Sequence, residues 1–252
     1  MKRVMGAVFA AFCVVSLGGP ARAEGDTGSL AILDKAVNAM GGEEKLAKVK
    51  AVSWKAKGTI RFGDNESKFT STTTVQDLNH FRREFEGDFG GNMFKAVTVV
   101  SGGKGWRKFG DNAMDLDEDA LANEKRNMYL QIVPATLLPL RGKGFKVETT
   151  GEEKVDGKAA LSVKAIGPDG KDFKIYFDKK SSLPMKVVAK VIGFMKDEYV
   201  QETTLGSYKD FAGIQRATKI DNKRDGDAFM TQEITDFQIL TKVDPKLFTQ
   251  PE

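Results

Sequence analysis

Residues 52–62 read VSWKAKGTIRF, and their side chains alternate between two kinds. The even-numbered positions are apolar or small, with Trp54 and Ile60 the largest, whereas the odd-numbered positions are polar or charged. A period of two is typical of a β-strand with one buried and one solvated face. Residues 63–65 (Gly-Asp-Asn) form a turn signal, and the Thr-rich residues 70–74 favour a second strand. The stretch therefore predicts an antiparallel β-hairpin.

The alternating pattern recurs along most of the chain. Further predicted strands are residues 81–89, 93–100, 104–109, 145–149, 159–166, 173–177, 183–191, 198–205, 214–220 and 229–239. Glycine, proline, aspartate and serine signals separate them, as expected of turns. Eleven or twelve strands at this spacing, with no Gly/Ser-rich or Pro-rich linker, predict a single mainly β domain.

Helical periodicity appears in two places. Near the start, residues 30–40 repeat apolar side chains every three to four positions, and residues 43–50 add a second short helix. In the middle of the chain, residues 121–131 are predicted to be helical, with acidic residues preceding them where a helix N-terminus favours negative charge. Pro134 is predicted to begin or kink a further short segment, residues 135–140.

The helical insertion, residues 115–141, favours one architecture over two others. A sheet with alternating faces must bury one face, in a sandwich, in a closed barrel, or in a half-barrel with helices on its concave side. The insertion carries an apolar side that needs a partner, and a concave sheet face supplies it. We therefore predict an α+β fold in which a strongly curved antiparallel sheet forms an incomplete β-barrel with a helical lid and an N-terminal helix.

Residues 1–23 have the features of a secretory signal peptide. Lys2 and Arg3 precede an uncharged apolar run, residues 4–17, and Ala21-Arg22-Ala23 forms an A-x-A cleavage site. The run is shorter than the roughly 20 residues that span a membrane. We predict export to the periplasm, with secretion as the alternative, and a domain comprising residues 24–252.

Composition excludes several classes of function. Cleavage would remove three basic residues and no acid, leaving 36 basic against 35 acidic residues, so the charge falls from +4 to +1. A near-neutral chain is not expected to bind nucleic acid. Cys13 would leave with the leader, and the single His80 cannot build a zinc cage, so no metal site or cofactor is predicted. A hydrolase would depend on His80 alone.

Large apolar side chains on the predicted strand faces and the helical insertion are the candidate ligand-binding residues. Core packing is the simpler interpretation of any one of them, because inward strand positions are normally core. The alternative is an apolar cavity for acyl chains, which bulky Phe and adaptable Met suit. The candidates are Trp54, Ile60, Phe62, Phe81, Phe85, Phe94, Trp106, Met128, Phe173, Phe177 and Met185.

Three local motifs resemble those of the LolA/LolB/RseB-like superfamily of periplasmic lipoprotein carriers and sensors. They are NHFRRE at residues 79–84, VSGGKGW at residues 100–106, and IYFD at residues 175–178 with SLPM at residues 182–185. The resemblance implies an incomplete, strongly curved β-barrel with a helical lid. Asp77 occupies the place of the carrier's lid-gripping arginine, so the carrier's transfer mechanism does not carry over.

From the resemblance we expect a periplasmic binding or carrier protein for a lipidic ligand, with lipoprotein acyl chains as one candidate. The protein is not predicted to be an enzyme or, after processing, an integral membrane protein. One alternative is an envelope sensor or interaction module that binds a membrane-protein partner. A periplasmic hydrolase ranks last.

Overall fold

The computed structural model describes residues 24–193 and 195–252, so the predicted signal peptide lies outside the described residues. The chain begins with two helices, α1 (Thr27–Ala39) and α2 (Glu43–Lys48). A longer helix, α3 (Glu118–Thr136), follows the first run of strands. Two 3₁₀ turns, η1 (Leu138–Arg141) and η2 (Pro245–Phe248), follow α3 and the last strand.

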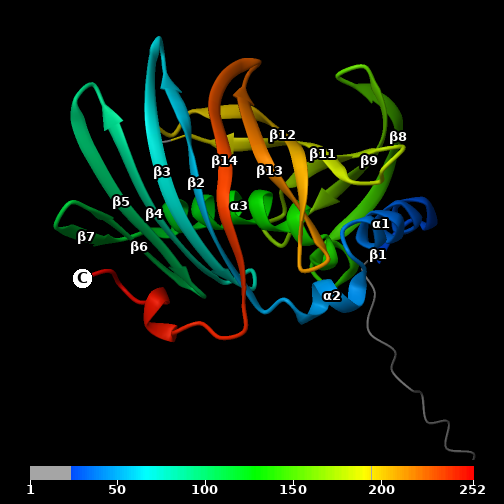
Figure 1. Cartoon of the computed structure of the whole chain (residues 1–252), viewed down its shortest axis with the longest axis horizontal. Coiled ribbons are helices and arrows are strands. Elements are labelled where there is room, and N and C mark those ends of the chain that lie inside the picture. Colours follow the sequence, from blue (N-terminus) through cyan, green and yellow to red (C-terminus); the bar gives the residue numbers. More distant parts are fainter. Residues whose placement is uncertain (1–23, 194) are drawn as a thin grey trace, which may run out of the picture.

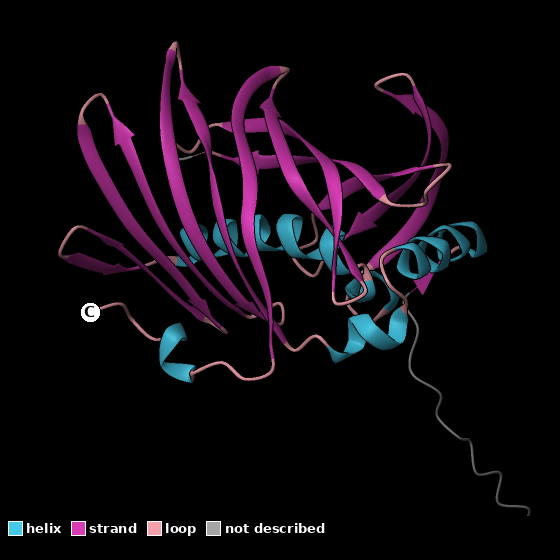
Figure 2. Ribbon diagram, viewed as in Figure 1, coloured by secondary structure: helices cyan, strands magenta, loops and turns pink. Residues whose placement is uncertain are grey.

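Within these residues, fourteen strands form one sheet that curves around α3 (Figures 1 and 2). Neighbouring strands are antiparallel, except for β1, which pairs in parallel with β8. In spatial order the strands are β1 (Glu24–Gly25), β8 (Lys146–Val155), β9 (Lys158–Ile166), β10 (Asp172–Asp178), β11 (Pro184–Ile192), β12 (Glu198–Phe211), β13 (Ile214–Arg224), β14 (Asp227–Leu240), β2 (Ala51–Phe62), β3 (Asn65–Gln76), β4 (His80–Phe89), β5 (Asn92–Ser101), β6 (Lys104–Phe109) and β7 (Asn112–Asp115).

Pairing of β14 with β2 joins the two runs of strands into the single sheet. Gly58 makes their close approach possible, because a Cβ atom there would lie 1.9 Å from the carbonyl oxygen of Thr231. β1 and β7 end the strand order, so the sheet is not closed. The predicted incomplete barrel is therefore confirmed, and its strand alternation follows the predicted pattern.

The two short strands, β1 and β7, were not predicted. β1 has two residues and β7 has four, and all four residues of β7 are exposed. Neither segment can show an alternation between a buried and a solvated face. Pairing with a longer neighbour, β8 or β6, creates both strands.

Side chains cap α1 and α3, each of which begins three residues before its predicted start. The Asp26 carboxylate accepts from the backbone N–H of Ser29, and that of Asp117 accepts from the N–H of Ala120. One expectation was wrong: Pro134 lies inside α3 and does not begin a new segment. It lies in the last turn of the helix, where it removes the hydrogen bond that a backbone N–H would donate to the carbonyl of Leu130, and the helix ends two residues later.

Two apolar clusters hold the helices on the sheet. The first packs α1, the end of α3 and η1 against β8–β11, and includes Phe173 and Phe177. The second packs the middle of α3 against β2, β4 and β14, and includes Phe81 and Met128. Within the described residues, no helix has both the length and the apolar character to cross a membrane.

Candidate ligand-binding cavity

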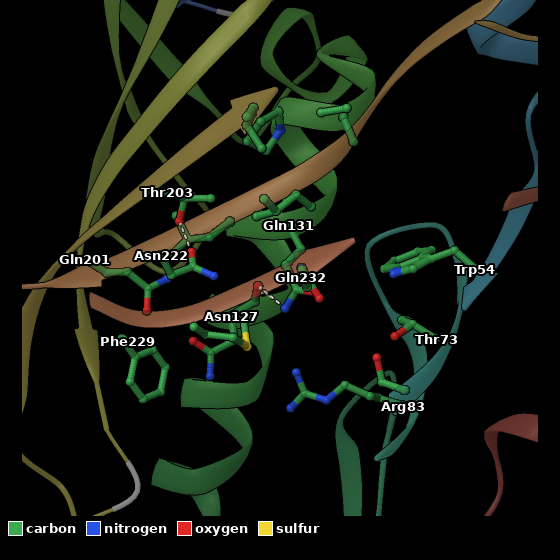
Figure 3. Close-up of a pocket in the computed structure, with 18 of the residues that line it drawn as sticks. Trp54, Thr73, Arg83, Asn127, Gln131, Gln201, Thr203, Asn222, Phe229 and Gln232 are labelled. Atoms are coloured by element: carbon green, nitrogen blue, oxygen red, sulfur yellow. Dashed lines mark hydrogen bonds between the residues drawn. The ribbon is translucent and has the colours of Figure 1, made fainter. Parts of the chain in front are cut away.

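A cavity of about 250 Å³ lies between α3 and the concave face of the sheet (Figure 3). Strands from both halves of the chain, β2–β4 and β12–β14, supply its walls, and α3 supplies a further side. The lining mixes apolar and polar side chains. It comprises Met40, Trp54, Ile60, Phe69, Ser71, Thr73, Arg83, Phe85, Asn127, Leu130, Gln131, Pro134, Ala135, Gln201, Thr203, Leu205, Tyr208, Arg216, Ala217, Ile220, Asn222, Arg224, Phe229, Met230 and Gln232.

One end of the cavity, which we call the base, lies near the starts of β2 and β13. Arg216 of β13 is only 8% exposed, and its guanidinium lies over the rings of Trp54, at 5.3 Å, and Phe237, at 5.7 Å. Burial lowers the pKa of Arg216 to about 10, so the side chain still carries its charge at neutral pH. Tyr208 donates a hydrogen bond to the carbonyl of Pro184 at 2.6 Å, and burial raises its pKa, so it stays neutral. The base therefore holds one buried positive charge.

Amides and hydroxyls form a belt across the middle of the cavity. Thr203 donates to the Asn222 side chain at 2.6 Å, and the Gln131 amide donates to the carbonyl of Asn127 at 3.2 Å (Figure 3). Arg83 points into the same space from the opposite wall. The cavity is therefore not the purely apolar space that the sequence predicts.

The other end of the cavity, which we call the rim, lies where the β2–β3, β4–β5 and β13–β14 hairpins turn, at the top of Figure 1. Aromatic rings continue outward from the lining: Phe69 stacks on Phe85 at 5.1 Å, and Phe229 meets Phe62 edge-on at 6.2 Å. Phe62 is 50% exposed and Phe94 is 40% exposed. Phe94 in turn contacts Phe85, at 6.4 Å. A continuous aromatic surface thus runs from the cavity to solvent.

Two neighbouring charges on α3 connect the helix to opposite walls. Glu124, 5% exposed, accepts from Arg107 of β6 at 2.5 Å and lies 3.9 Å from Arg83 of β4. Arg126, 2% exposed, pairs with Asp169 at 3.5 Å. It also donates to the carbonyls of residues 171 and 172, in the β9–β10 hairpin. The helix therefore bridges the gap between the two halves of the sheet.

The structure brings three of the predicted ligand-binding residues together in the cavity: Trp54, Ile60 and Phe85. The other eight lie outside it. Phe81, Met128, Phe173 and Phe177 are fully packed in the two apolar clusters, Phe62 and Phe94 lie at the rim, and Trp106 and Met185 are half-buried.

Sequence reasoning missed the polar lining. Its signal was present in β13, where Ile220, Asn222 and Arg224 alternate with exposed or half-exposed charged residues. A polar residue at an inward strand position marks either a hydrogen-bonded core or a cavity wall. Counting such positions in β12 and β13 would have indicated this lining.

The remaining candidate chemistry is sparse. His80 contacts the Asp77 carboxylate at 3.2 Å and lies beside the ring of Phe248, away from the cavity. Across residues 24–193 and 195–252, no group of three or more His, Cys, Asp or Glu side chains could hold a metal ion.

Known proteins share this architecture at low sequence identity. No protein-family model matches the chain, and no curated protein matches it significantly. A LolA superfamily protein from Nitrosomonas europaea superimposes with a TM-score of 0.58 at 10% identity, covering 88% of this chain and 97% of its own.

Two further solved structures agree. A DUF1329 family protein from Desulfovibrio piger gives a TM-score of 0.55 at 12% identity, covering 88% of this chain and 97% of its own. An outer-membrane lipoprotein-sorting domain from Vibrio parahaemolyticus gives 0.53 at 10% identity, covering 86% and 97%. The chain therefore has a LolA-like fold, as the resemblance of its sequence motifs implies.

Proposed function

We propose that this protein is an exported, non-enzymatic carrier or binding protein of the cell envelope, and that it holds an acyl chain of a lipidic ligand beneath α3. The observation that carries the proposal is the cavity, which continues through an aromatic rim to solvent. One protein of the same fold is named as a lipoprotein-sorting domain, which supports this class of ligand.

The volume of the cavity limits what it can hold. An engineered cavity of about 150 Å³ accommodates one benzene ring, so about 250 Å³ accommodates on the order of ten non-hydrogen atoms. That is one medium-length chain, or the end of a longer chain that leaves through the rim. Several acyl chains of one lipoprotein would need α3 to move outward.

Burial of the chain supplies the affinity. Eight methylene groups contribute roughly 6 kcal/mol at about 0.8 kcal/mol each. Association and ordering remove at least about 4 kcal/mol of this gain. The roughly 2 kcal/mol that remain correspond to a dissociation constant of tens of millimolar, so eight methylene groups alone bind weakly and further contacts have to add to this gain.

The test combines recovery of native lipid with a blocked cavity. The full chain is expressed with its own leader and purified from the envelope, and bound lipid is identified by mass spectrometry. Ala217→Phe places a ring in the cavity, where Ala217 is part of the lining. Because one ring fills about 150 Å³, this variant should take up little fluorescent fatty acid.

The control is Ala159→Phe, the same change at an exposed position of β9. This variant should take up the probe as the unchanged protein does. Lipid-free protein that also fails to bind the probe would refute the proposal, as would undiminished uptake by Ala217→Phe.

A further inference from the structure

Three charged side chains in the described part of the protein are more than nine-tenths buried, and one of them has no counter-ion. Glu124 pairs with Arg107, and Arg126 pairs with Asp169. Arg216 makes no ion pair or hydrogen bond within residues 24–193 and 195–252, and its Nε is fully buried without a partner. Buried charges are normally paired, so a missing anion is the feature to explain.

The groups that face Arg216 are neutral. The rings of Trp54 and Phe237 flank the guanidinium. Tyr208 is the titratable group whose charge affects the pKa of Arg216. Cation–π contacts stabilise the charge only in part, and they leave the N–H donors of the guanidinium unused. The fold therefore presents a planar fork of donors with no acceptor supplied by the described chain.

Arg216 is part of the lining of the cavity and also borders a smaller cavity of about 30 Å³ beside it, so its side chain adjoins the space that a ligand would occupy. Arg224, at the other end of β13, lies over Phe229 at the rim. Eight residues of strand separate the two arginines, or about 26 Å at 3.3 Å per residue. The cavity thus has a buried cation at its base, and aromatic rings together with a second arginine at its mouth.

We propose that Arg216 binds the carboxylate of a free fatty acid whose chain extends from the base of the cavity toward the aromatic rim. The inference rests on the proposed function and names its ligand class. A guanidinium and a carboxylate match in a bidentate pair. One positive charge is neutralised by one carboxylate, whereas a phosphate monoester carries about −1.5 to −2 at neutral pH.

This orientation also separates free acids from lipoproteins. The acyl chains of a lipoprotein are esters and amides, which offer no carboxylate to Arg216. Their head group is a protein, which cannot enter the base of a cavity of about 250 Å³. A head-inward free acid satisfies both the charge and the volume.

The experiment compares three ten-carbon probes on the full chain, stripped of bound lipid: decanoate, decanol and decyl phosphate. Binding is measured by calorimetry for the unchanged protein, Arg216→Met, Arg216→Lys and Arg61→Met. Arg61 is a half-exposed arginine on β2 that pairs with Glu66, so it controls for loss of a positive charge. Met keeps the length of the side chain without its charge.

We expect the unchanged protein to bind decanoate at least about tenfold more tightly than decanol, since a hydrogen bond to a charged group is worth that much. Arg216→Met should lose this preference and bind decanol at least as tightly as before. Arg216→Lys should keep part of the preference, and Arg61→Met all of it.

Two results would overturn the inference while leaving the proposed function intact: equal affinity for decanoate and decanol, or a preference for decanoate that survives Arg216→Met. Binding of decyl phosphate that is tighter than that of decanoate and depends on Arg216 would also overturn the inference, because the head group of the ligand would then be a phosphate and not a carboxylate. If the unchanged protein binds none of the probes, the proposed function fails and the inference fails with it.

Discussion

Arg216 and Arg126 are both deeply buried arginines, and the same substitution should change stability in opposite directions at the two sites. Arg126 has a carboxylate and two carbonyls as acceptors, whereas Arg216 has only aromatic rings. Arg216→Met removes a charge that the ligand-free protein leaves unpaired. Arg126→Met removes a charge that is paired.

The pKa of Arg216 gives the size of the first effect. A fall of its pKa to about 10 means that the charged form is less favourable in the folded than in the unfolded protein by about 3 kcal/mol. The folded protein binds the proton less tightly, so this cost is fully present below about pH 10 and disappears only as the pH rises above that value toward the ordinary pKa of arginine. At pH 7 the whole cost applies.

The net gain from Arg216→Met is smaller than this cost, because the substitution also removes two cation–π contacts worth about 0.5–1 kcal/mol each. We expect the free energy of unfolding to rise by about 1–2 kcal/mol, and Tm by roughly 2–8 °C for a protein of this size. Arg126→Met should lower the free energy of unfolding by about 2–4 kcal/mol, since the Oδ2 of Asp169 and the carbonyls of residues 171 and 172 lose their donor.

Urea denaturation at pH 7, followed by Trp fluorescence, measures both variants against the lipid-free unchanged protein. Decanoate should then stabilise the unchanged protein more than it stabilises Arg216→Met, because only the former offers the carboxylate a partner. A loss of more than 1 kcal/mol in lipid-free Arg216→Met would show that the guanidinium is satisfied in the folded state. Arg216 would then not be an unpaired charge in the lipid-free protein.

Three further changes test the lid, the rim and the sheet. Glu124→Gln removes the charge that pairs with Arg107. The release of a fluorescent fatty acid, measured by stopped-flow displacement, should therefore be severalfold faster. An unchanged rate would mean that this contact does not restrain α3. Phe62→Ser, at a half-exposed rim position, should slow uptake from vesicles while Tm shifts by less than about 2 °C; equal uptake would exclude the rim as the entry route. Gly58→Ala should lower the free energy of unfolding, measured in urea, by more than about 2 kcal/mol, because the added Cβ atom would meet the carbonyl of Thr231. An unchanged free energy of unfolding would show that β2 and β14 separate easily.

The alternation in residues 52–62, which recurs in the other long strands, made most of the sheet predictable. In half-buried antiparallel strands, apolar and polar residues alternate, so the sequence indicates which side chains face the core. Its limits have physical causes. Strand β8 continues past residue 149, since Gly151, at φ 100°, forms a bulge and not a turn. Strand β12 likewise runs through Gly206 and Ser207 to Phe211. Turn-favouring residues thus mark bulges as well as strand ends.

The cavity was less predictable than the fold. Trp54 and Ile60 line it as the apolar pattern predicts, but so do Asn222 and Arg216, which are polar and charged. Whether an inward residue borders a cavity or a filled core depends on what faces it from α3. That pairing is set by tertiary packing, and the period of a strand carries no information about it.

The contacts of α3 indicate how the cavity could open. On the β9–β10 side, Arg126 donates to backbone carbonyls, which the fold holds in place, and the helix packs chiefly on β11. On the β4–β6 side, Glu124 pairs with Arg83 and Arg107, whose side chains are partly exposed and can be rehydrated when the contact breaks. The second set of contacts therefore costs less to break, because water replaces the lost partner of a partly exposed charge.

Opening should thus begin on the side that faces Arg83, where the polar belt of the cavity lies. A ligand would pass polar side chains and aromatic rings while the first apolar cluster, behind α3, stays closed.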